Sequence, residues 1–459
     1  MLGPRLSGTD AHRALITDVA AELAELGYDV HRDPHVFERW EVADSEVALS
    51  IAETSIPVSS AWPYSGETPP EGIAAPLVLL DGRRKNWKAA RGKIAVVDVH
   101  NADVPTTLLA SPWSDSLPFD STANPVISSE LAGTNLTKAR AAGVRGVVAT
   151  WRGLGDEAAR GQYLPFTRDY QGILAIWTPE SQRDAIRAAA QRGSTATLIL
   201  PATRTPGARM DTVWAVSPGT GPHADESILV VTHSDGGNAV EENGHLGLLA
   251  LARDAAAAPH DRTIVFVCTA GHLRMPAVTA HGQATTAWLD AHPEMWSPDT
   301  PGLTAVAGLA IEHLGAKHLH VDPQTGRYEA DGSLEPELLY ATTRELADLT
   351  RAVWHGAAGR SARPVKPGAL IHFGEGEPMF ERRIPAIALV TGPDYLLADV
   401  ERDLVDLDAL AEQIGSFRRL QVHLADAENS AAFGRVRLPG KAKKVVAALR
   451  AILFLARHA

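Results

Sequence analysis

The chain has 459 residues, with 43 Lys and Arg against 55 Asp and Glu, and its formal net charge at pH 7 is −12. This length exceeds one ordinary hydrophobic core, so we expect two domains. No run of basic residues is longer than the three at 83–85, which together with the acidic balance argues against a nucleic-acid partner.

Neither end of the sequence predicts a targeting or membrane segment. The first residues lack an apolar stretch after a basic start, so no signal peptide is expected. The apolar run 445–456 contains Arg450 and is well short of the roughly 20 residues that span a bilayer. We therefore expect a cytoplasmic protein with no membrane partner. Cys268, the single cysteine, is interpreted as a small core residue.

The first element expected is an amphipathic helix. Thr9 or Asp10 can cap it, apolar residues recur every three to four positions from Leu15 to Leu26, and Gly27 ends it. Residues 56–72 are rich in Pro, Ser and Gly and mark a domain boundary. Beyond it we expect a helix at 129–142 and strands at 76–80, 93–99, 144–151, 172–177 and 196–200.

In the second half of the sequence, predicted strands and helices alternate. Strands are expected at 212–216, 227–232, 263–268, 303–311 and 385–390, and helices at 244–257, 335–354, 407–425 and 442–456. This alternation predicts an α/β fold with a mostly parallel sheet covered by helices on both faces. We expect residues 1–55 and 205–459 to form this domain, with residues 56–204 inserted as a β-rich domain. Four aromatic residues of the inserted domain are expected in its core rather than in a pocket. They are Trp62, Tyr64, Trp113 and Trp151.

Polar side chains gather where the predicted strands end. His233 and Asp235 directly follow the apolar run 227–232, and an imidazole there with a carboxylate beside it is a common way to present a metal ligand. Since the carboxyl ends of parallel strands meet at one edge, other such residues are expected nearby. They are Glu241, Glu242, His245, His272, Glu312, His313, His372, Glu375 and Glu377.

The segment 217–272, from SPGTGPHADESILVVTHSDGGNAVEENGHLG to VCTAGH, resembles the core of the two-zinc aminopeptidases. That family includes bacterial leucine aminopeptidases, glutamate carboxypeptidase, glutaminyl cyclase and the transferrin receptor. The later segments AIEHLG, EPMFERRIPAIAL and DYLLADVERDLVDLDAL are similar to the family's in the same order. The resemblance covers roughly residues 207–425 plus the first helix, and it implies a zinc exopeptidase fold. Residues 56–204 look like the protease-associated domain that many members carry as an insertion.

The resemblance also assigns roles to individual residues, and this chain differs from the family pattern at several of those positions. His233 matches the first zinc ligand and Asp235 the carboxylate that orients it. The bridging Asp corresponds to Glu241 or Glu242, and the further Asp to Glu312. The family's Glu-Glu pair, a general base and a ligand, is replaced by His272 and Leu273, and its final His falls near Gly376. The second metal site thus loses two of its three protein ligands.

These departures predict a mononuclear centre or none. His233, Glu242 and Glu312 are expected to hold one divalent metal, with zinc as the first choice. His272 is expected to act as general base and then acid, and Asp235 to orient His233. His313, grouped with these catalytic residues, is expected to support the site or to contact the substrate. Substrate contacts are expected from three residues, Glu241, His372 and Glu377.

The functional prediction is a metallohydrolase that acts on a peptide, an amide or a related small molecule. Two alternatives stay open, a noncatalytic binding or assembly protein on the same fold and a metal-free enzyme that uses His272 with Glu312 or His313. The oligomeric state is open and includes a homo-oligomer. The transferrin receptor, within the resemblance, implies that this fold persists without catalysis.

Overall fold

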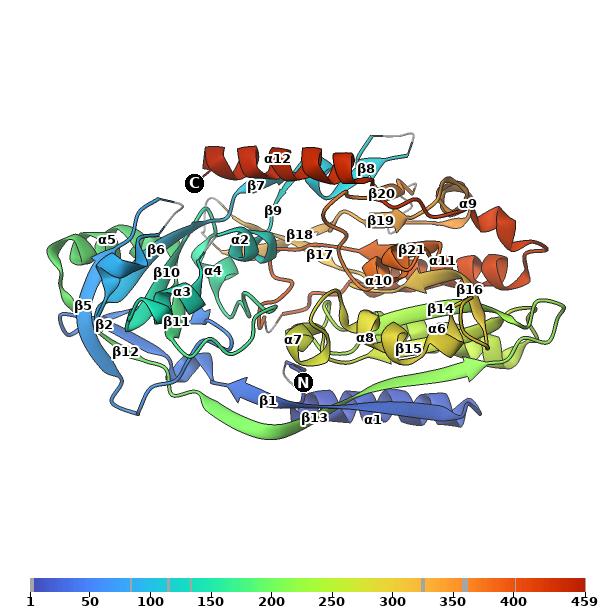
Figure 1. Cartoon of the computed structure of the whole chain (residues 1–459), viewed down its shortest axis with the longest axis horizontal. Coiled ribbons are helices and arrows are strands. Elements are labelled where there is room, and N and C mark those ends of the chain that lie inside the picture. The colour runs from blue at the N-terminus through green and yellow to red at the C-terminus, as the bar shows by residue number, and fades with distance from the viewer. Residues whose placement is uncertain are drawn as a thin grey trace.

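The computed structural model describes residues 4–82, 85–113, 116–132, 134–322, 327–356, 362–400 and 402–458. Figure 1 shows two large sheets side by side, with most strands of the N-terminal half on the left and those of the C-terminal half on the right; the strands Val30–Glu41 and Ala110–Pro112 also belong to the right-hand sheet. A long ribbon along the bottom joins the two sheets. It consists of β1 (Val30–Glu41) paired antiparallel with β13 (Thr203–Ser217), so the chain enters and leaves the left-hand unit through adjacent strands.

The right-hand sheet has nine strands. Its four central strands, β15, β14, β16 and β21, run parallel, whereas β1, β13, β19 and β8 each pair antiparallel with a neighbour. The sheet is therefore parallel at its centre and mixed at its flanks. In spatial order its strands are β1, β13, β15 (Thr263–Thr269), β14 (Glu226–His233), β16 (Thr304–Ala310), β21 (Ala386–Val390), β19 (Leu338–Ala341), β20 (Val365–Pro367) and β8 (Ala110–Pro112).

Helices cover both faces of this sheet because every central strand is apolar on both sides. In β14, Ile228 and Val230 face one core while Leu229 and Val231 face the other, as strand alternation requires. The predicted α/β fold with a helix-covered sheet is confirmed. The first core is closed by α1 (Asp10–Glu25), α6 (Gly244–Ala257), α9 (Arg344–Val353) and α11 (Leu407–Asp426), and the second by α8 (Ala284–Ala291) and α10 (Gly376–Glu381).

The left-hand sheet has eight strands and also has a core on each face. It includes β2 and β3, which lie before the boundary expected at residue 56. Trp62, Trp177 and Trp151 stack in succession inside it, with ring centroids 4.8 and 4.3 Å apart. In spatial order its strands are β3 (Thr54–Ile56), β2 (Ala48–Ile51), β12 (Thr195–Ile199), β5 (Ile73–Leu79), β6 (Ile94–His100), β10 (Gly146–Arg152), β11 (Leu174–Thr178) and β4 (Ser60–Ala61).

The remaining elements are short, apart from α12 (Lys441–His458), which lies along the top of the molecule in Figure 1. No helix in the described ranges combines the length and the apolar character that a membrane crossing requires. The other strands are β7 (Asp103–Pro105), β9 (Ser121–Ala123), β17 (Lys317–Val321) and β18 (Tyr328–Leu334). The other α-helices are α2 (Pro125–Leu131), α3 (Leu136–Ala141), α4 (Asp156–Ala159), α5 (Arg183–Arg192) and α7 (Met275–Val278).

Two predicted helices differ from the structure for local reasons. The helix expected at 335–354 begins as strand β19, whose residues pair with β21 before Thr343 caps α9. The helix expected at 129–142 is two short helices, because Asn135 turns the chain and caps α3 through its side chain. The long strand β1 has no predicted counterpart, because its burial depends on pairing with β13.

Candidate functional site

The site lies at the carboxyl ends of the central parallel strands, where open α/β sheets place their ligands. His233 is the last residue of β14, Glu312 and His313 follow β16, and His272 follows β15. Glu241 lies between β14 and α6. All five side chains are buried. The sheet thus brings together residues that are up to 80 positions apart.

His233 is oriented by a backbone group. Its Nδ1 lies 3.0 Å from the carbonyl oxygen of Asp235, and a carbonyl only accepts, so Nδ1 carries the proton. Nε2 therefore presents a lone pair, and it lies 3.7 Å from Oε2 of Glu312. Burial and the nearby His272 lower the pKa of His233 to about 4. The imidazole is neutral near pH 7, as a metal ligand must be.

His313 faces Glu241 across the site. Its Nδ1 lies 2.8 Å from the carbonyl oxygen of Thr391, and its Nε2 lies 3.1 Å from Oε2 of Glu241. The backbone of His313 has a φ of 55°, a left-handed conformation that is uncommon for this residue type. Burial alone would raise the pKa of Glu241, but His313, His233 and His272 bring that pKa below its ordinary value. Glu241 is therefore a carboxylate at neutral pH.

The two carboxylate oxygens of Glu312 differ in their hydrogen bonding. Its Oε1 accepts a hydrogen bond of 2.7 Å from the backbone N–H of Glu375, while its Oε2 has no hydrogen-bond partner among the described residues. Burial, assisted by the charge of Glu375, raises the pKa of Glu312 to about 7. A cation beside Oε2 would stabilise the ionised form.

His272 is paired with Glu375, which lies just before α10. Its Nδ1 is 2.9 Å from Oε1 of Glu375, and Oε2 of Glu375 accepts a 2.8 Å hydrogen bond from the backbone of Thr285. Burial lowers the pKa of His272, but the hydrogen bond and charge of Glu375, with the charges of Glu241 and Asp235, raise it to about 9. His272 is thus an imidazolium at neutral pH. Its ring stacks on His233, with centroids 4.2 Å apart.

The carboxylate of Asp235 supports His272 rather than His233. It accepts hydrogen bonds from the backbone N–H groups of Gly271 and His272, both at 3.1 Å, and of Leu273 at 2.8 Å. Ser7 of the N-terminal segment donates to the same carboxylate. Asp235 therefore fixes the start of the 3-10 turn His272–Arg274, and its own backbone carbonyl makes the contact to His233 that the sequence assigned to its side chain.

Glu242, the expected metal ligand, points away from the cluster. Its carboxylate forms an ion pair with Arg5, and Glu242 is absent from both groups of residues whose ligand atoms converge. The geometry thus places Glu241, not Glu242, at the site. The difference arises because Arg5, more than 200 positions earlier, provides a cation for one of two adjacent glutamates.

The other expected substrate contacts lie outside the crevice. His372 is enclosed by Tyr340 and Phe380, with ring centroids 4.4 and 5.5 Å away, and burial lowers its pKa to about 3. Glu377 contacts Gln283 at 3.4 Å, and burial, with Glu381 nearby, raises its pKa to about 7. Neither residue lines the crevice beside the histidine cluster.

Gly376 stands where the resemblance places the final metal ligand, and it has no room for a side chain. A Cβ atom there would lie 2.6 Å from the Cβ of Ala388 and 3.4 Å from Nε2 of His372. Leu273, at the other altered position, is buried in the apolar core between the two units. Packing therefore closes both positions to a metal ligand.

A crevice of about 280 Å³ opens beside the cluster, and both units contribute to its walls. Phe166 of the left-hand unit stacks near His272, with ring centroids 5.4 Å apart. The sequence signals neither this contact nor the pairing of Glu375 with His272, since both are tertiary. The crevice walls include Leu109, Phe119, Asn124, Ile127, Phe166, Glu241, His272, Gln283, Glu312, His313 and Phe373.

Two groups of three residues place their ligand atoms within 4.8 Å of one another, and both contain His233. One adds Glu312 and His313, and the other adds Glu241 and His272. Four buried atoms of the cluster form no well-aligned hydrogen bond with the described residues, although buried polar atoms are normally satisfied. They are Nε2 of His233, Oε2 of Glu241, Oε2 of Glu312 and Nε2 of His313. Two of the four, Oε2 of Glu241 and Nε2 of His313, face each other at 3.1 Å.

No protein-family model matches the sequence, and no curated protein matches it significantly. Solved structures do match over nearly the whole chain. An aminopeptidase from Aneurinibacillus sp. strain AM-1 is 16% identical, with a TM-score of 0.62 over 96% of this chain and 94% of that one. BSAP, a zinc aminopeptidase from Bacillus subtilis, is 15% identical, with a TM-score of 0.61 over 95% and 94%.

A peptidase M28 precursor from Shewanella amazonensis SB2B is 18% identical, with a TM-score of 0.63 over 96% of this chain and 93% of that one. At such identities the likeness establishes the fold alone. The chain has the α/β fold of these three peptidases. What it does must be argued from its own site.

Proposed function

We propose that the chain is a hydrolase of amide or peptide bonds that uses one divalent metal ion in the crevice. The observation that carries this proposal is the set of four buried atoms in the cluster that form no well-aligned hydrogen bond, on His233, Glu241, Glu312 and His313. Leaving such atoms unsatisfied costs about 1–3 kcal/mol each, and a metal ion held by His233, Glu312 and His313 would satisfy three of the four.

The ligands we propose are His233, Glu312 and His313, because two imidazoles and a carboxylate form a common catalytic zinc set. The other group includes His272, whose pKa of about 9 favours the imidazolium form, which cannot ligate a metal. Against the effect of burial, Glu241 also raises the pKa of His313, so metal binding at His313 would release a proton. Both groups depend on His233, which has one free nitrogen, so we expect a single ion. His313 takes the place that the sequence prediction gave to Glu242.

When bound, such a metal polarises the carbonyl group of the substrate and stabilises negative charge on its oxygen. The proton transfers belong to Glu241 and His272. Glu241, ionised at neutral pH, can accept the proton of the attacking water, and His272 can donate its Nε2 proton to the departing amine. Nε2 of His272 lies 3.7 Å from Oε1 of Glu241, so both groups reach the same reacting centre. The high pKa of His272 favours this acid role over the base role predicted from the sequence.

The crevice walls support a substrate with an apolar side chain. Phe119, Phe166 and Phe373 line the crevice together with Leu109 and Ile127. Its small volume, about 280 Å³, suits one amino-acid residue and the bond beside it rather than a folded chain. The likeness to aminopeptidases supports the same substrate class.

Hydrolysis of aminoacyl 4-nitroanilides tests the proposal. We expect Leu- and Phe-4-nitroanilide to be cleaved by the wild-type chain, with kcat lowered about 100-fold or more by E241Q and by H272Q. H281A, at an exposed histidine, is the matched control and should leave kcat unchanged. Hydrolysis that persists after complete metal removal would favour a metal-free acid–base enzyme. No hydrolysis by metal-loaded protein would favour a noncatalytic protein on the same fold.

A further inference from the structure

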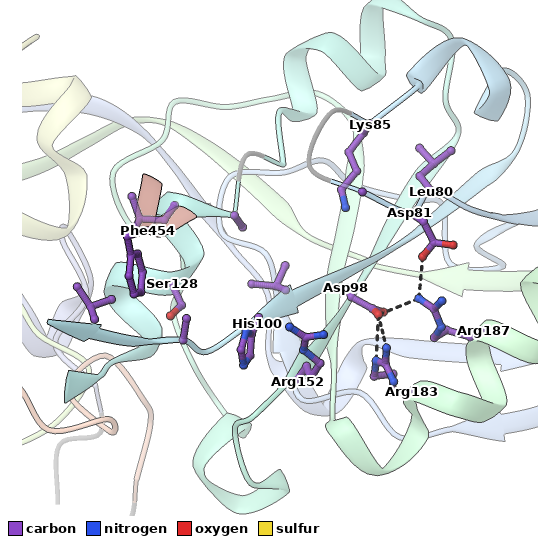
Figure 2. A pocket seen from close by; sticks show the side chains of 16 residues that line it. Leu80, Asp81, Lys85, Asp98, His100, Ser128, Arg152, Arg183, Arg187 and Phe454 are labelled. Carbon is purple, nitrogen blue, oxygen red and sulfur yellow. Dashed lines mark hydrogen bonds and ion pairs between the residues drawn. The ribbon is translucent and has the colours of Figure 1, made fainter. Parts of the chain in front are cut away.

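The inserted unit contains a second pocket, remote from the histidine cluster, with a volume of about 370 Å³. Figure 2 shows Lys85, Arg152, Arg183 and Arg187 around it, together with the carboxylates of Asp81 and Asp98. Arg183 and Arg187 come from α5, Arg152 ends β10, and Lys85 precedes the 3-10 turn Trp87–Ala90. Phe454 of α12 completes one wall.

Two of these cations are neutralised. Oδ2 of Asp98 accepts hydrogen bonds from Nε and Nη2 of Arg183 at 2.9 and 2.7 Å and from Nη1 of Arg187 at 2.8 Å. Asp81 contacts the same Nη1 of Arg187 at 3.0 Å. The two carboxylates thus balance the two arginines of α5 and hold their guanidinium groups in fixed positions.

The other two cations have no such partner. The side chains of Lys85 and Arg152 form no ion pair or hydrogen bond with any residue in the described ranges, although both residues are only partly exposed. Burial lowers the pKa of Lys85 despite the charges of Asp98 and Asp81, which means that its ammonium group is poorly solvated. Four cations and two carboxylates leave the pocket with an excess of positive charge in a chain whose net charge is −12.

We propose that this pocket binds a small anion through a phosphate or carboxylate group held by Lys85 and Arg152. A planar guanidinium group and an ammonium group that line the same pocket suit either oxyanion, since the first can donate two parallel hydrogen bonds and the second supplies a point charge. The arginines of α5, already fixed by Asp98, add positive potential to one side. An anion would restore charge balance in a partly dehydrated pocket, where such pairs are stronger than in water.

The pocket and the crevice share helix α2. Ser128 and Leu131 line the pocket, whereas Val126 and Ile127 on the same helix line the crevice. An anion in the pocket should therefore slow hydrogen exchange in α2 as well as in α5. This readout requires neither a metal nor hydrolysis, so it can fail or succeed independently of the proposed function.

Calorimetric titration of the full chain tests the proposal with two probes, pyrophosphate and succinate, in about 150 mM NaCl. We expect one or both to bind with a Kd of about 1 mM or lower. K85Q and R152Q should each weaken binding about tenfold, and R152K should weaken it less than R152Q. R192Q removes an exposed arginine from the same helix α5 and should bind like the wild type.

H233A separates this pocket from the crevice, because an anion held by a metal would be lost in H233A and kept in R152Q. We expect the reverse pattern. Pyrophosphate binding alone identifies a phosphate ligand, and succinate binding alone identifies a carboxylate ligand. The proposal is overturned if neither probe binds below about 10 mM, or if folded K85Q and R152Q both bind like R192Q.

Discussion

Nδ1 of His272 lies 2.9 Å from Oε1 of Glu375, and this pairing defines the chemical state of the site. A histidine beside a buried carboxylate has a raised pKa, which for His272 is about 9. His272 also follows β15, and Glu375 directly precedes α10 more than 100 positions later, so the pair connects the end of β15 to the start of α10.

The pair predicts a specific pH profile for E375Q. Without the carboxylate, the pKa of His272 falls toward its ordinary value, so the protonated acid is lost at a lower pH. The alkaline limb of kcat should move from near pH 9 toward neutrality, and kcat at pH 8 should fall about 10- to 100-fold. E377Q, two residues away and outside the crevice, is the control. An unshifted alkaline limb in E375Q would remove His272 from the acid role.

Glu242 is predicted to be structural. E242Q leaves Arg5 without its partner and should lower the free energy of unfolding by about 1–3 kcal/mol, measured by urea denaturation. It should leave the metal content and kcat close to wild type. E241Q is the matched comparison, since it should lower kcat about 100-fold or more. Loss of metal in E242Q but not in H313A would reverse this assignment.

Gly376 should not accept the histidine that the family resemblance places there. A Cβ atom at 376 would lie 2.6 Å from the Cβ of Ala388, inside a packed core. G376H should therefore lower the free energy of unfolding by at least about 1–3 kcal/mol, as overpacking does, and should bind no additional metal. G415H, on α11 where a Cβ meets only the side chain of Arg419, controls for a histidine placed in a helix. A stable G376H that binds a second metal would contradict the packing argument.

Asp394 predicts a pH-dependent stability outside the site. Burial raises the pKa of Asp394 to about 7, and Tyr328 donates a hydrogen bond to its carboxyl group. Because the folded state holds this proton more tightly than the unfolded state, the contribution to stability is full below about pH 4 and is lost as the pH rises through 7. Over this range D394N should show a shallower loss of stability than wild type, by a few kcal/mol. Equal slopes in urea denaturation at pH 4 to 8 would refute this.

The sequence predicts the scaffold of the site better than its contacts. The apolar run 227–232 places His233 at a strand end, and the same pattern places Glu312 and His313 after β16. The choice between Glu241 and Glu242 could not be predicted, because it depends on Arg5, which is distant in sequence.

Other features depend on geometry that no local pattern encodes. The left-handed backbone conformation of His313 directs its ring toward Glu241, and no sequence motif predicts that φ angle. The pairing of Glu375 with His272 depends on how α10 packs against the strand ends. Residues 338–341 have a helical pattern but form a strand, because they pair with β21. In each case a tertiary contact overrides the local signal.

Metal stoichiometry tests the central claim most directly. The full chain, purified without chelator and then exposed to zinc, should contain about one equivalent by inductively coupled plasma mass spectrometry, for the reason that both ligand groups share His233. H233A and H313A should contain none, while E242Q and H281A should retain the full equivalent. Two equivalents in the wild type, or one equivalent that survives in both H233A and H313A, would contradict the proposed centre.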